Sequence, residues 1–227
     1  MENTTMENTR TKTTRNSLIL LLTAAIWGMA FVSQSKGMDY MHPFTFNGVR
    51  SLIGAASILV YILISRKIAG DKAAPLDWKL NVKAGLLCGI FLTIASTLQQ
   101  FGIKYTSVGK AGFVTTLYII FVPMFGIFLK KKVAPVVWAA AVMAAVGMYL
   151  LCMTESLRLG AGDIMVFLCA IAFAIQIMTV DHYAARIDGA VVSCIQFTVC
   201  GVVCCIGALI WGQPTFCLLY TSPSPRD

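Results

Sequence analysis

The chain has 227 residues, of which 58% are hydrophobic and only 12% are charged. A typical soluble domain is about 45–50% apolar and about 25% charged, so this composition excludes an ordinary soluble protein and predicts an integral membrane protein. The formal net charge of +8 would suit a nucleic-acid or lipid partner, but the positions of the charges favour membrane topology as its explanation.

The first part of the chain is polar, and the rest is a series of apolar runs. Residues 1–15 contain the sequence Met-Glu-Asn-Thr twice and are expected to form a disordered cytoplasmic N-terminus. Seven apolar runs follow, at about 16–34, 43–65, 80–103, 107–129, 134–153, 162–180 and 189–211. A helix needs about 20 residues to cross the hydrocarbon core of a bilayer, whereas barrel strands are shorter and alternate. The predicted fold class is an all-α membrane protein, a polytopic helix bundle with about seven transmembrane helices.

The lysine and arginine residues in the loops predict the orientation of these spans. If the N-terminus is cytoplasmic, 12 of these residues fall in inside segments and four outside. The four on the outside are Lys36, Lys104, Lys110 and Arg158. Cytoplasmic loops of membrane proteins carry the excess of positive charge. We therefore expect a multi-pass protein of the cell membrane with a cytoplasmic N-terminus. The run Lys130–Lys132 is first an orientation signal and second a candidate for binding acidic lipids.

The most informative stretch is the second span, because Arg50 lies within it. A charge near the middle of a membrane helix costs roughly 2.5–3.5 kcal/mol on insertion scales, so an ionisable residue there indicates a functional site. Asn47 and Gly54 lie on the same helical face as Arg50, at spacings of three and four residues. Two interpretations are open. Arg50 either lines a cavity and binds an anionic group, or it is a structural arginine that snorkels outward or binds backbone carbonyls.

Polar side chains from three other spans are expected in the same half of the membrane as Arg50, given a rise of about 1.5 Å per helical residue. The simplest explanation is a water-accessible substrate cavity. Its predicted lining is Arg50, Asn47, Gln99, Gln100, Trp27 and Thr115. For any single Ser or Thr the alternative is a hydrogen bond within its own helix or to a neighbouring one.

Other patterns concern packing and chemistry. Gly85 and Gly89 form a GxxxG motif that favours close helix packing, and Pro123 is expected to interrupt the fourth span. The eight cysteines show no CxxC or Cys/His metal spacing and are interpreted as small hydrophobic residues. No carboxylate lies in the middle of a span, and no nucleophile is paired with a base. We therefore expect no enzyme activity, no catalytic or metal site and no cofactor.

The region from Asn16 to Met153 resembles the first half of an EamA-type member of the drug/metabolite transporter superfamily. The resemblance rests on the order and spacing of several motifs over about 200 residues. These are Trp27-Gly28 within the first span, the Pro43–Arg50 spacing, the stretch Leu98–Leu129, Gly147, and Gly162-Asp163 at the start of the sixth span. One departure is the run Lys130–Lys132, where the family often has an acidic residue followed by a basic one.

The resemblance implies ten helices arranged as two inverted five-helix repeats, which commonly place a substrate site at the midplane between them. On this basis residues 16–153 would form the first EamA-like repeat and residues 160–216 the incomplete start of the second. Residues 217–227 resemble translated adapter sequence and are expected to be a non-native tail on a truncated chain.

Together these observations predict a transporter that moves a small metabolite, amino-acid-like or another small organic solute, across the cytoplasmic membrane by alternating access. The alternative is a non-transporting membrane scaffold or accessory subunit. The expected partners are a small-molecule substrate and the lipid bilayer, with no nucleic acid. A homodimer is left open, because nothing in the sequence supports or excludes it.

Overall fold

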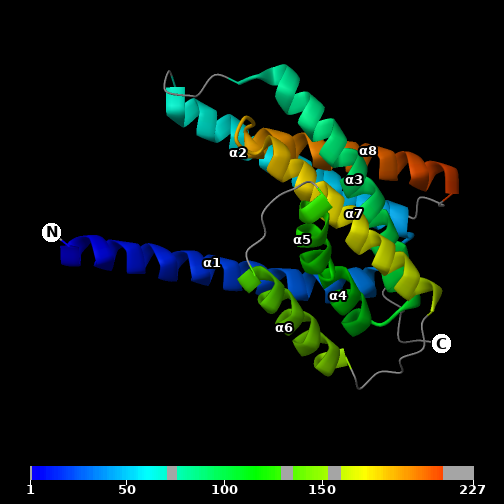
Figure 1. The fold of residues 1–227 in the computed structure, drawn as a ribbon. Helices are drawn as coiled ribbons and strands as arrows, with labels where there is room; N and C mark the ends of the chain where they lie inside the picture. Colours follow the sequence, from blue (N-terminus) through cyan, green and yellow to red (C-terminus); the bar gives the residue numbers. More distant parts are fainter. Residues whose placement is uncertain (1, 71–75, 129–134, 153–159, 212–227) are drawn as a thin grey trace, which may run out of the picture.

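The computed structural model describes residues 2–70, 76–128, 135–152 and 160–211. Within these ranges the chain folds into helices and contains no strand, which confirms the predicted all-α class (Figure 1). The helices are α1 (Glu2–Gly37), α2 (Pro43–Ala69), α3 (Trp78–Tyr105), α4 (Val108–Thr116), α5 (Tyr118–Phe128), α6 (Pro135–Cys152), α7 (Ala161–Tyr183) and α8 (Gly189–Trp211).

Six segments of the described residues are long and apolar enough to cross a membrane. They are Asn16–Gly37, Pro43–Ile68, Trp78–Tyr105, Val108–Phe128, Ala161–Tyr183 and Gly189–Trp211. Helices α4 and α5 together make one of these segments, and α6 coincides with the fifth apolar run of the sequence. The chain is therefore a multi-pass membrane protein, as its composition predicts.

Side-chain caps explain where several of these helices begin. The Asp77 carboxylate accepts a hydrogen bond from the Leu80 N–H at 3.1 Å, and the Ser107 hydroxyl accepts one from the Lys110 N–H at 3.2 Å. Helix α2 begins at a proline, whose fixed φ suits the first helical position. His42 precedes that proline, and its Nδ1 accepts from the Phe44 N–H at 3.4 Å. Burial and, second, the Lys104 cation lower the pKa of His42, which favours the neutral imidazole that can accept this bond.

The fourth predicted span is broken at a different residue from the one expected. Pro123 lies inside α5, and the interruption is at Leu117, between α4 and α5. The Leu117 N–H donates to the Val114 carbonyl at 3.2 Å, an i to i−3 bond that closes α4 with a tight turn. A new helix then starts, with Ile120 and Phe121 donating to the Leu117 carbonyl. Pro123 falls in the second turn of α5, which therefore lacks the hydrogen bond that an N–H at this position would make to the Ile119 carbonyl.

The N-terminal segment is helical, whereas the C-terminal tail lies outside the described residues. Helix α1 continues back to Glu2 across the segment that the sequence predicts to be disordered. Neither proline nor glycine occurs between Glu2 and Trp27, so no residue there stops the propagation of the helix. The expected non-native tail, residues 217–227, lies outside the described residues, as does the run Lys130–Lys132.

Helix α3 lies at the centre of the bundle and packs against both α7 and α8, while α2 packs along α8 (Figure 1). The predicted GxxxG motif makes the α3–α8 contact. A Cβ atom added to Gly85 would lie 2.7 Å from the Ile195 side chain, and one added to Gly89 would lie 2.8 Å from Val199. Hydrogen atoms at these two positions therefore let the helix backbones approach closely, as small residues do where lipid provides no hydrophobic force between helices.

The α3–α7 contact is closer still and involves backbone on both sides. A Cβ atom on Gly102 would lie 2.4 Å from Val166 Cγ2 and 3.0 Å from the Gly162 carbonyl oxygen. A Cβ atom on Gly162 would in turn lie 2.9 Å from the Gly102 carbonyl oxygen. Because backbone atoms cannot move aside as a flexible side chain does, these two glycines set the separation of α3 and α7.

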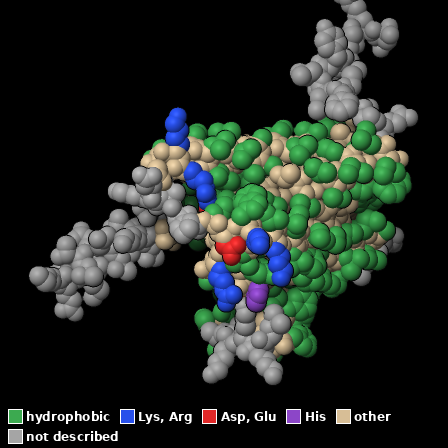
Figure 2. Space-filling view, turned by 90° about the horizontal axis from the view of Figure 1, so that it is seen from above, with side chains coloured by type: hydrophobic (Ala, Val, Ile, Leu, Met, Phe, Trp, Pro, Cys, Tyr) green, Lys and Arg blue, Asp and Glu red, His purple; other side chains and the backbone are tan. Residues whose placement is uncertain are grey.

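Helix α1 has a different environment from the rest of the bundle. None of the residues in its most apolar stretch is buried, and it approaches α3 and α4 only toward its C-terminal end (Figure 1). There Phe31 packs against a small core made of Ile103, Ala111 and Val166. Figure 2 shows how far hydrophobic side chains cover the surface of the whole molecule, as expected for a protein surrounded by lipid.

We predict that Gly102→Ala lowers the thermal unfolding temperature of the purified protein in detergent. The added methyl must displace Val166 or the α7 backbone, and overpacking of this kind costs about 1–3 kcal/mol. The matched control is Gly28→Ala in α1, where an added Cβ meets nothing within 4 Å. That variant should unfold at the wild-type temperature or slightly above it, because alanine favours helix. Equal effects of the two substitutions would contradict the close α3–α7 contact.

Candidate functional site

Two of the predicted cavity residues, Asn47 and Arg50, form a bonded pair on α2. Arg50 Nη2 donates to Asn47 Oδ1 at 2.8 Å, because residues three apart share a helical face. Asn47 is almost fully buried, with 1% of its surface exposed, and its Nδ2 donates to Ser96 Oγ of α3 at 3.0 Å. The Arg50 side chain is exposed and its guanidinium lies over the Phe46 ring, 5.8 Å from the centroid. The pair thus connects a buried amide to an exposed cation.

Helix α8 completes this arrangement with two buried cysteines, Cys200 and Cys204. The Ser51 hydroxyl donates to Cys200 Sγ at 3.4 Å, and Ser96 Oγ lies 3.4 Å from the same sulfur. Asn47 Nδ2 is 3.6 Å from Cys204 Sγ. The sequence interpretation of these cysteines as small hydrophobic residues is therefore incomplete, because both lie in polar contacts. We call Asn47, Arg50, Ser51, Ser96, Cys200 and Cys204 the α2–α3–α8 polar cluster.

A second pair of predicted residues lies between α3 and α4. Gln99 Nε2 donates to Thr115 Oγ1 at 3.3 Å, and both side chains are buried. This bond joins residues 16 apart in sequence on two helices. Thr115 therefore bonds a neighbouring helix rather than its own. Thr116 bonds its own helix, since its hydroxyl donates to the Gly112 carbonyl.

Gln100 lies one turn beyond Ser96 on α3 and is fully buried. Its Nε2 donates to the Gln34 backbone carbonyl of α1 at 3.5 Å. The side-chain oxygens Gln34 Oε1, Gln100 Oε1 and Thr45 Oγ1 are buried and have no hydrogen-bond partner among the described residues. Because Phe44 and Phe101 are in ring contact, with centroids 5.2 Å apart, Thr45 lies at the level of Gln100.

An unpartnered buried oxygen costs about 1–3 kcal/mol of desolvation, so three of them at one level need an explanation. Water or a ligand with N–H or O–H donors would satisfy them. Gln34 and Thr45 were not among the residues singled out from the sequence. Gln34 is a polar residue at the end of the first apolar run, and a polar residue in a predicted span is the signal that could have identified it.

The sixth predicted residue, Trp27, lies apart from the other five. Its side chain is 55% exposed on the unburied stretch of α1, and no described residue forms a ring or hydrogen-bond contact with it. The structure therefore joins Asn47 to Arg50, and Gln99 to Thr115, by hydrogen bonds. It places Gln100 beside α1 and Trp27 on the surface.

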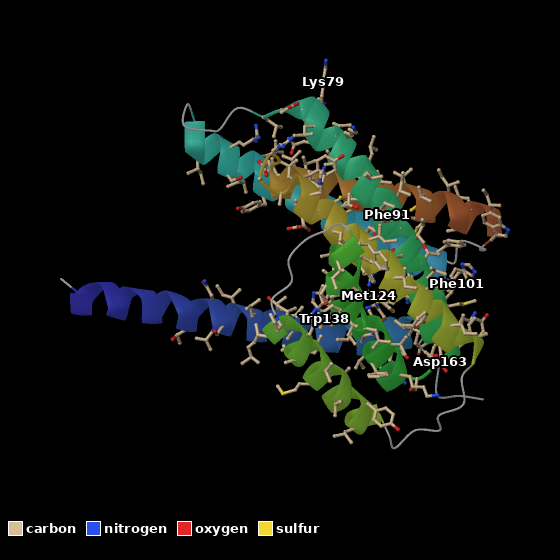
Figure 3. The ribbon with its side chains drawn as sticks, viewed as in Figure 1. Lys79, Phe91, Phe101, Met124, Trp138 and Asp163 are labelled. Carbon is tan, nitrogen blue, oxygen red and sulfur yellow. The ribbon has the colours of Figure 1, made fainter. Side chains whose placement is uncertain are left out.

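Two aspartates join the later helices to the earlier ones at opposite ends of the bundle. The first is Asp163 in the first turn of α7, which Figure 3 shows at the end opposite to Lys79. Its carboxylate accepts from the Thr106 hydroxyl and, at 2.9 Å, from the Gly160 N–H. It also lies 3.7 Å from Lys110 Nζ of α4, and both side chains are largely buried. We call the contacts of Asp163 with Thr106 and Lys110 the Asp163 tether.

The second aspartate is Asp188, which caps the start of α8. Its carboxylate accepts from the Ala190 N–H at 3.0 Å and lies 3.5 Å from Arg66 Nη2 of α2. Its backbone N–H donates to Asn81 Oδ1 of α3 at 2.9 Å. We call the contacts of Asp188 with Arg66 and Asn81 the Asp188 tether. Neither aspartate was among the predicted site residues, because both stand at helix ends, where a capping role explains them equally well.

The described part of the chain contains no group of three or more His, Cys, Asp or Glu side chains that could hold a metal ion. The α2–α3–α8 polar cluster and the surroundings of Gln100 offer hydrogen-bonding amides and hydroxyls, two thiols and one cationic guanidinium. Amides, hydroxyls and a guanidinium are groups that can bind and orient a polar solute.

Comparison with known proteins identifies a family and a relative. Residues 15–153 match the model of the EamA-like transporter family. The chain is 30% identical over 171 residues to a protein described as an uncharacterized transporter from Archaeoglobus fulgidus, and the match covers 73% of this chain and 48% of that relative. The chain thus spans about half the length of the curated relative. No solved structure matches it significantly. Both matches describe transporters, and neither describes an enzyme. This chain belongs to the EamA-like transporter family.

Proposed function

We propose that the chain takes part in moving a small organic solute, amino-acid-like in its charges, across the cell membrane by alternating access. Two features of this membrane protein together carry the proposal. One is the Arg50 cation bonded to Asn47, and the other is the set of unpartnered buried oxygens in adjacent helices. Family membership supports transport of a small molecule through a lipid bilayer. The class of substrate and the mechanism are inferences from the residues.

The chemistry of these groups favours a substrate with both a carboxylate and an amine. Only Nη2 of the Arg50 guanidinium is used by Asn47, so the remaining N–H groups are available to a carboxylate, which arginine binds through paired hydrogen bonds. The oxygens of Gln34 and Gln100 are acceptors that suit an ammonium group. Gln100 lies one helical turn from Ser96, which contacts Asn47, so both kinds of group face one region of the bundle.

The two tethers support an alternating-access mechanism, which needs each end of the protein to open while the other is closed. The Asp163 tether joins α7 to α3 and α4, and the Asp188 tether joins α8 to α2 and α3. Each tether consists of a few polar contacts and one ion pair, which can break and form again without unfolding a helix. The two aspartates lie at opposite ends of the bundle, so each tether suits a gate at its own end.

We infer further that the Asp188 end is cytoplasmic, together with the N-terminus. The described cations at that end are Arg66, Lys67, Lys79, Lys83 and Arg186, whereas those at the Asp163 end are Lys36, Lys104 and Lys110. The excess of lysine and arginine at the Asp188 end supports this orientation, because cytoplasmic loops are the more basic.

One observation favours the alternative of a membrane scaffold or accessory subunit, namely the unburied apolar stretch of α1. Such a stretch would suit contact with a further membrane helix as well as with lipid. The two functions differ in their consequences, because substitutions in the α2–α3–α8 polar cluster should abolish transport but leave a scaffold unaffected.

We predict that Arg50→Ala abolishes uptake by proteoliposomes without reducing the amount of protein inserted. The assay measures saturable uptake of the radiolabelled standard amino acids and of small carboxylic acids, one at a time. For the solute that wild type transports, Arg50→Ala should lower uptake at low solute concentration by tenfold or more, because a carboxylate would lose its charged partner. Arg50→Lys should retain part of it.

The control for this experiment is Lys104→Ala, an exposed cation on α3 whose described contact is with the Tyr105 ring. That variant should transport at the wild-type rate. Normal uptake by Arg50→Ala would refute the role of Arg50. Absence of saturable uptake for every solute, from a chain that is folded and inserted, would favour the scaffold.

We also predict opposite responses at the two ends when one tether is weakened. Asp163→Asn removes the charge that attracts Lys110, so hydrogen exchange of residues 106–112 should become faster. If access alternates, residues 185–192 at the Asp188 end should become more protected in the same sample. Arg66→Gln should produce the reverse pattern. Faster exchange at both ends in either variant would mean that the tethers only stabilise the fold, and the measurement requires no known substrate.

A further inference from the structure

A cleft of about 530 Å³ opens between α3, α5 and α7, away from the α2–α3–α8 polar cluster. Its walls are almost entirely apolar. The lining residues are Leu87, Phe125, Phe128, Ile175, Met178, Thr179, His182 and Tyr183. The volume lies in the range of about 300–1,000 Å³ that ligand-binding clefts occupy. The lining lacks the charged and amide groups that would select a small polar solute, so this cleft suits an apolar chain.

The rim of the cleft at the Asp188 end is basic. Helices α3 and α7 run antiparallel, with Gly102 against Gly162 and Val166, so continuing this register places Lys83 at the level of His182. Lys83 also lies one turn from Leu87 of the lining, and Arg186 follows in the turn after α7. Figure 2 shows Lys and Arg side chains gathered in one area, beside a histidine and a carboxylate.

Two cations at this rim form no ion pair with another described residue. They are Lys83 and Arg186, and both are exposed. Of the two nearby aspartates, Asp188 contacts Arg66. An apolar cleft between membrane helices, next to cations that form no ion pair with a described residue, therefore matches the two chemical parts of an anionic membrane lipid.

We propose that this cleft is a binding site for an anionic phospholipid. One acyl chain lies against Leu87, Ile175 and Met178, and the phosphate-containing headgroup lies among Lys83, His182 and Arg186. The acyl chain has an apolar environment both in the cleft and in the bilayer, so the headgroup contacts provide the selectivity. Basic pockets between membrane helices bind acidic headgroups in this way.

The test uses the 227-residue chain purified in a neutral detergent, with dioleoyl phosphatidylglycerol and dioleoyl phosphatidylcholine as the probes. Native mass spectrometry should show one phosphatidylglycerol retained per chain under conditions that remove phosphatidylcholine. The double variant Lys83→Gln/Arg186→Gln should reduce this retention by tenfold or more. The matched control Lys36→Gln/Lys104→Gln removes two cations from the opposite end and should retain the lipid as wild type does.

A second variant tests the cleft rather than the rim. Met178→Trp fills the cleft and should lower phosphatidylglycerol retention although Lys83 and Arg186 remain, whereas Met143→Trp, at a 74% exposed position on α6, should not. Equal retention of the two lipids, or no effect of the rim and cleft variants, would overturn the proposal. So would a dimer of chains in place of a lipid adduct. Because no step measures transport, this result is independent of the proposed function.

Discussion

The close crossing of α3 with α7 and α8 is the constraint on which the remaining features depend. Gly102 and Gly162 bring the backbones of α3 and α7 together, so that a Cβ added to either glycine would lie within 3.0 Å of the carbonyl oxygen of the other. That approach places the end of α3 beside the start of α7, so the Thr106 hydroxyl can reach the Asp163 carboxylate. Gly85 and Gly89 do the same for α8, and the approach brings Cys200 within 3.4 Å of Ser96. A larger side chain at these positions would separate the helices and, with them, the polar contacts.

Polar groups inside a membrane protein must find partners within the protein, because lipid tails offer none. Here the buried amide of Asn47 bonds both Ser96 and Arg50, and Gln99 bonds Thr115. The oxygens of Gln34, Thr45 and Gln100 are the contrasting case, since they are buried and unpartnered among the described residues. The bonds of Asn47, Ser96, Gln99 and Thr115 join neighbouring helices, whereas the unpartnered oxygens contribute nothing to that joining. The apolar cleft between α3, α5 and α7 is a third environment, suited to lipid rather than to a polar solute.

Much of the fold could be predicted from hydrophobicity alone, because each span must satisfy its own backbone and therefore shows as an apolar run of about 20 residues. The second span illustrates this. The run 43–65 predicted from the sequence corresponds to α2 at Pro43–Ala69, which begins at the proline and ends before Gly70, whose φ is 51°. The sequence predicts a break of the fourth span at Pro123, but the break lies at Leu117, because the turn there depends on local hydrogen bonding that residue type does not reveal. The polarity of Asn47 and Arg50 is evident from the sequence, whereas the contact of Asn47 with Cys204 is not, because cysteines in apolar runs suggest hydrophobic residues.

By itself, the sequence determined that this is a multi-pass helical membrane protein, which residues form its spans, and which polar residues those spans carry. Composition and the spacing of residues along one helix are local properties, and they can be read without knowing which helices are neighbours. Only the tertiary structure decided that α3 bonds Asn47 through Ser96 and Thr115 through Gln99. It also decided that Cys200 contacts Ser51 and Ser96, and that Trp27 lies on the surface. These are relations between residues far apart in sequence. They depend on which helix faces meet at small residues such as Gly102 and Gly162. Hydrophobic periodicity does not specify which helices are neighbours in lipid, because every helix there has an apolar surface.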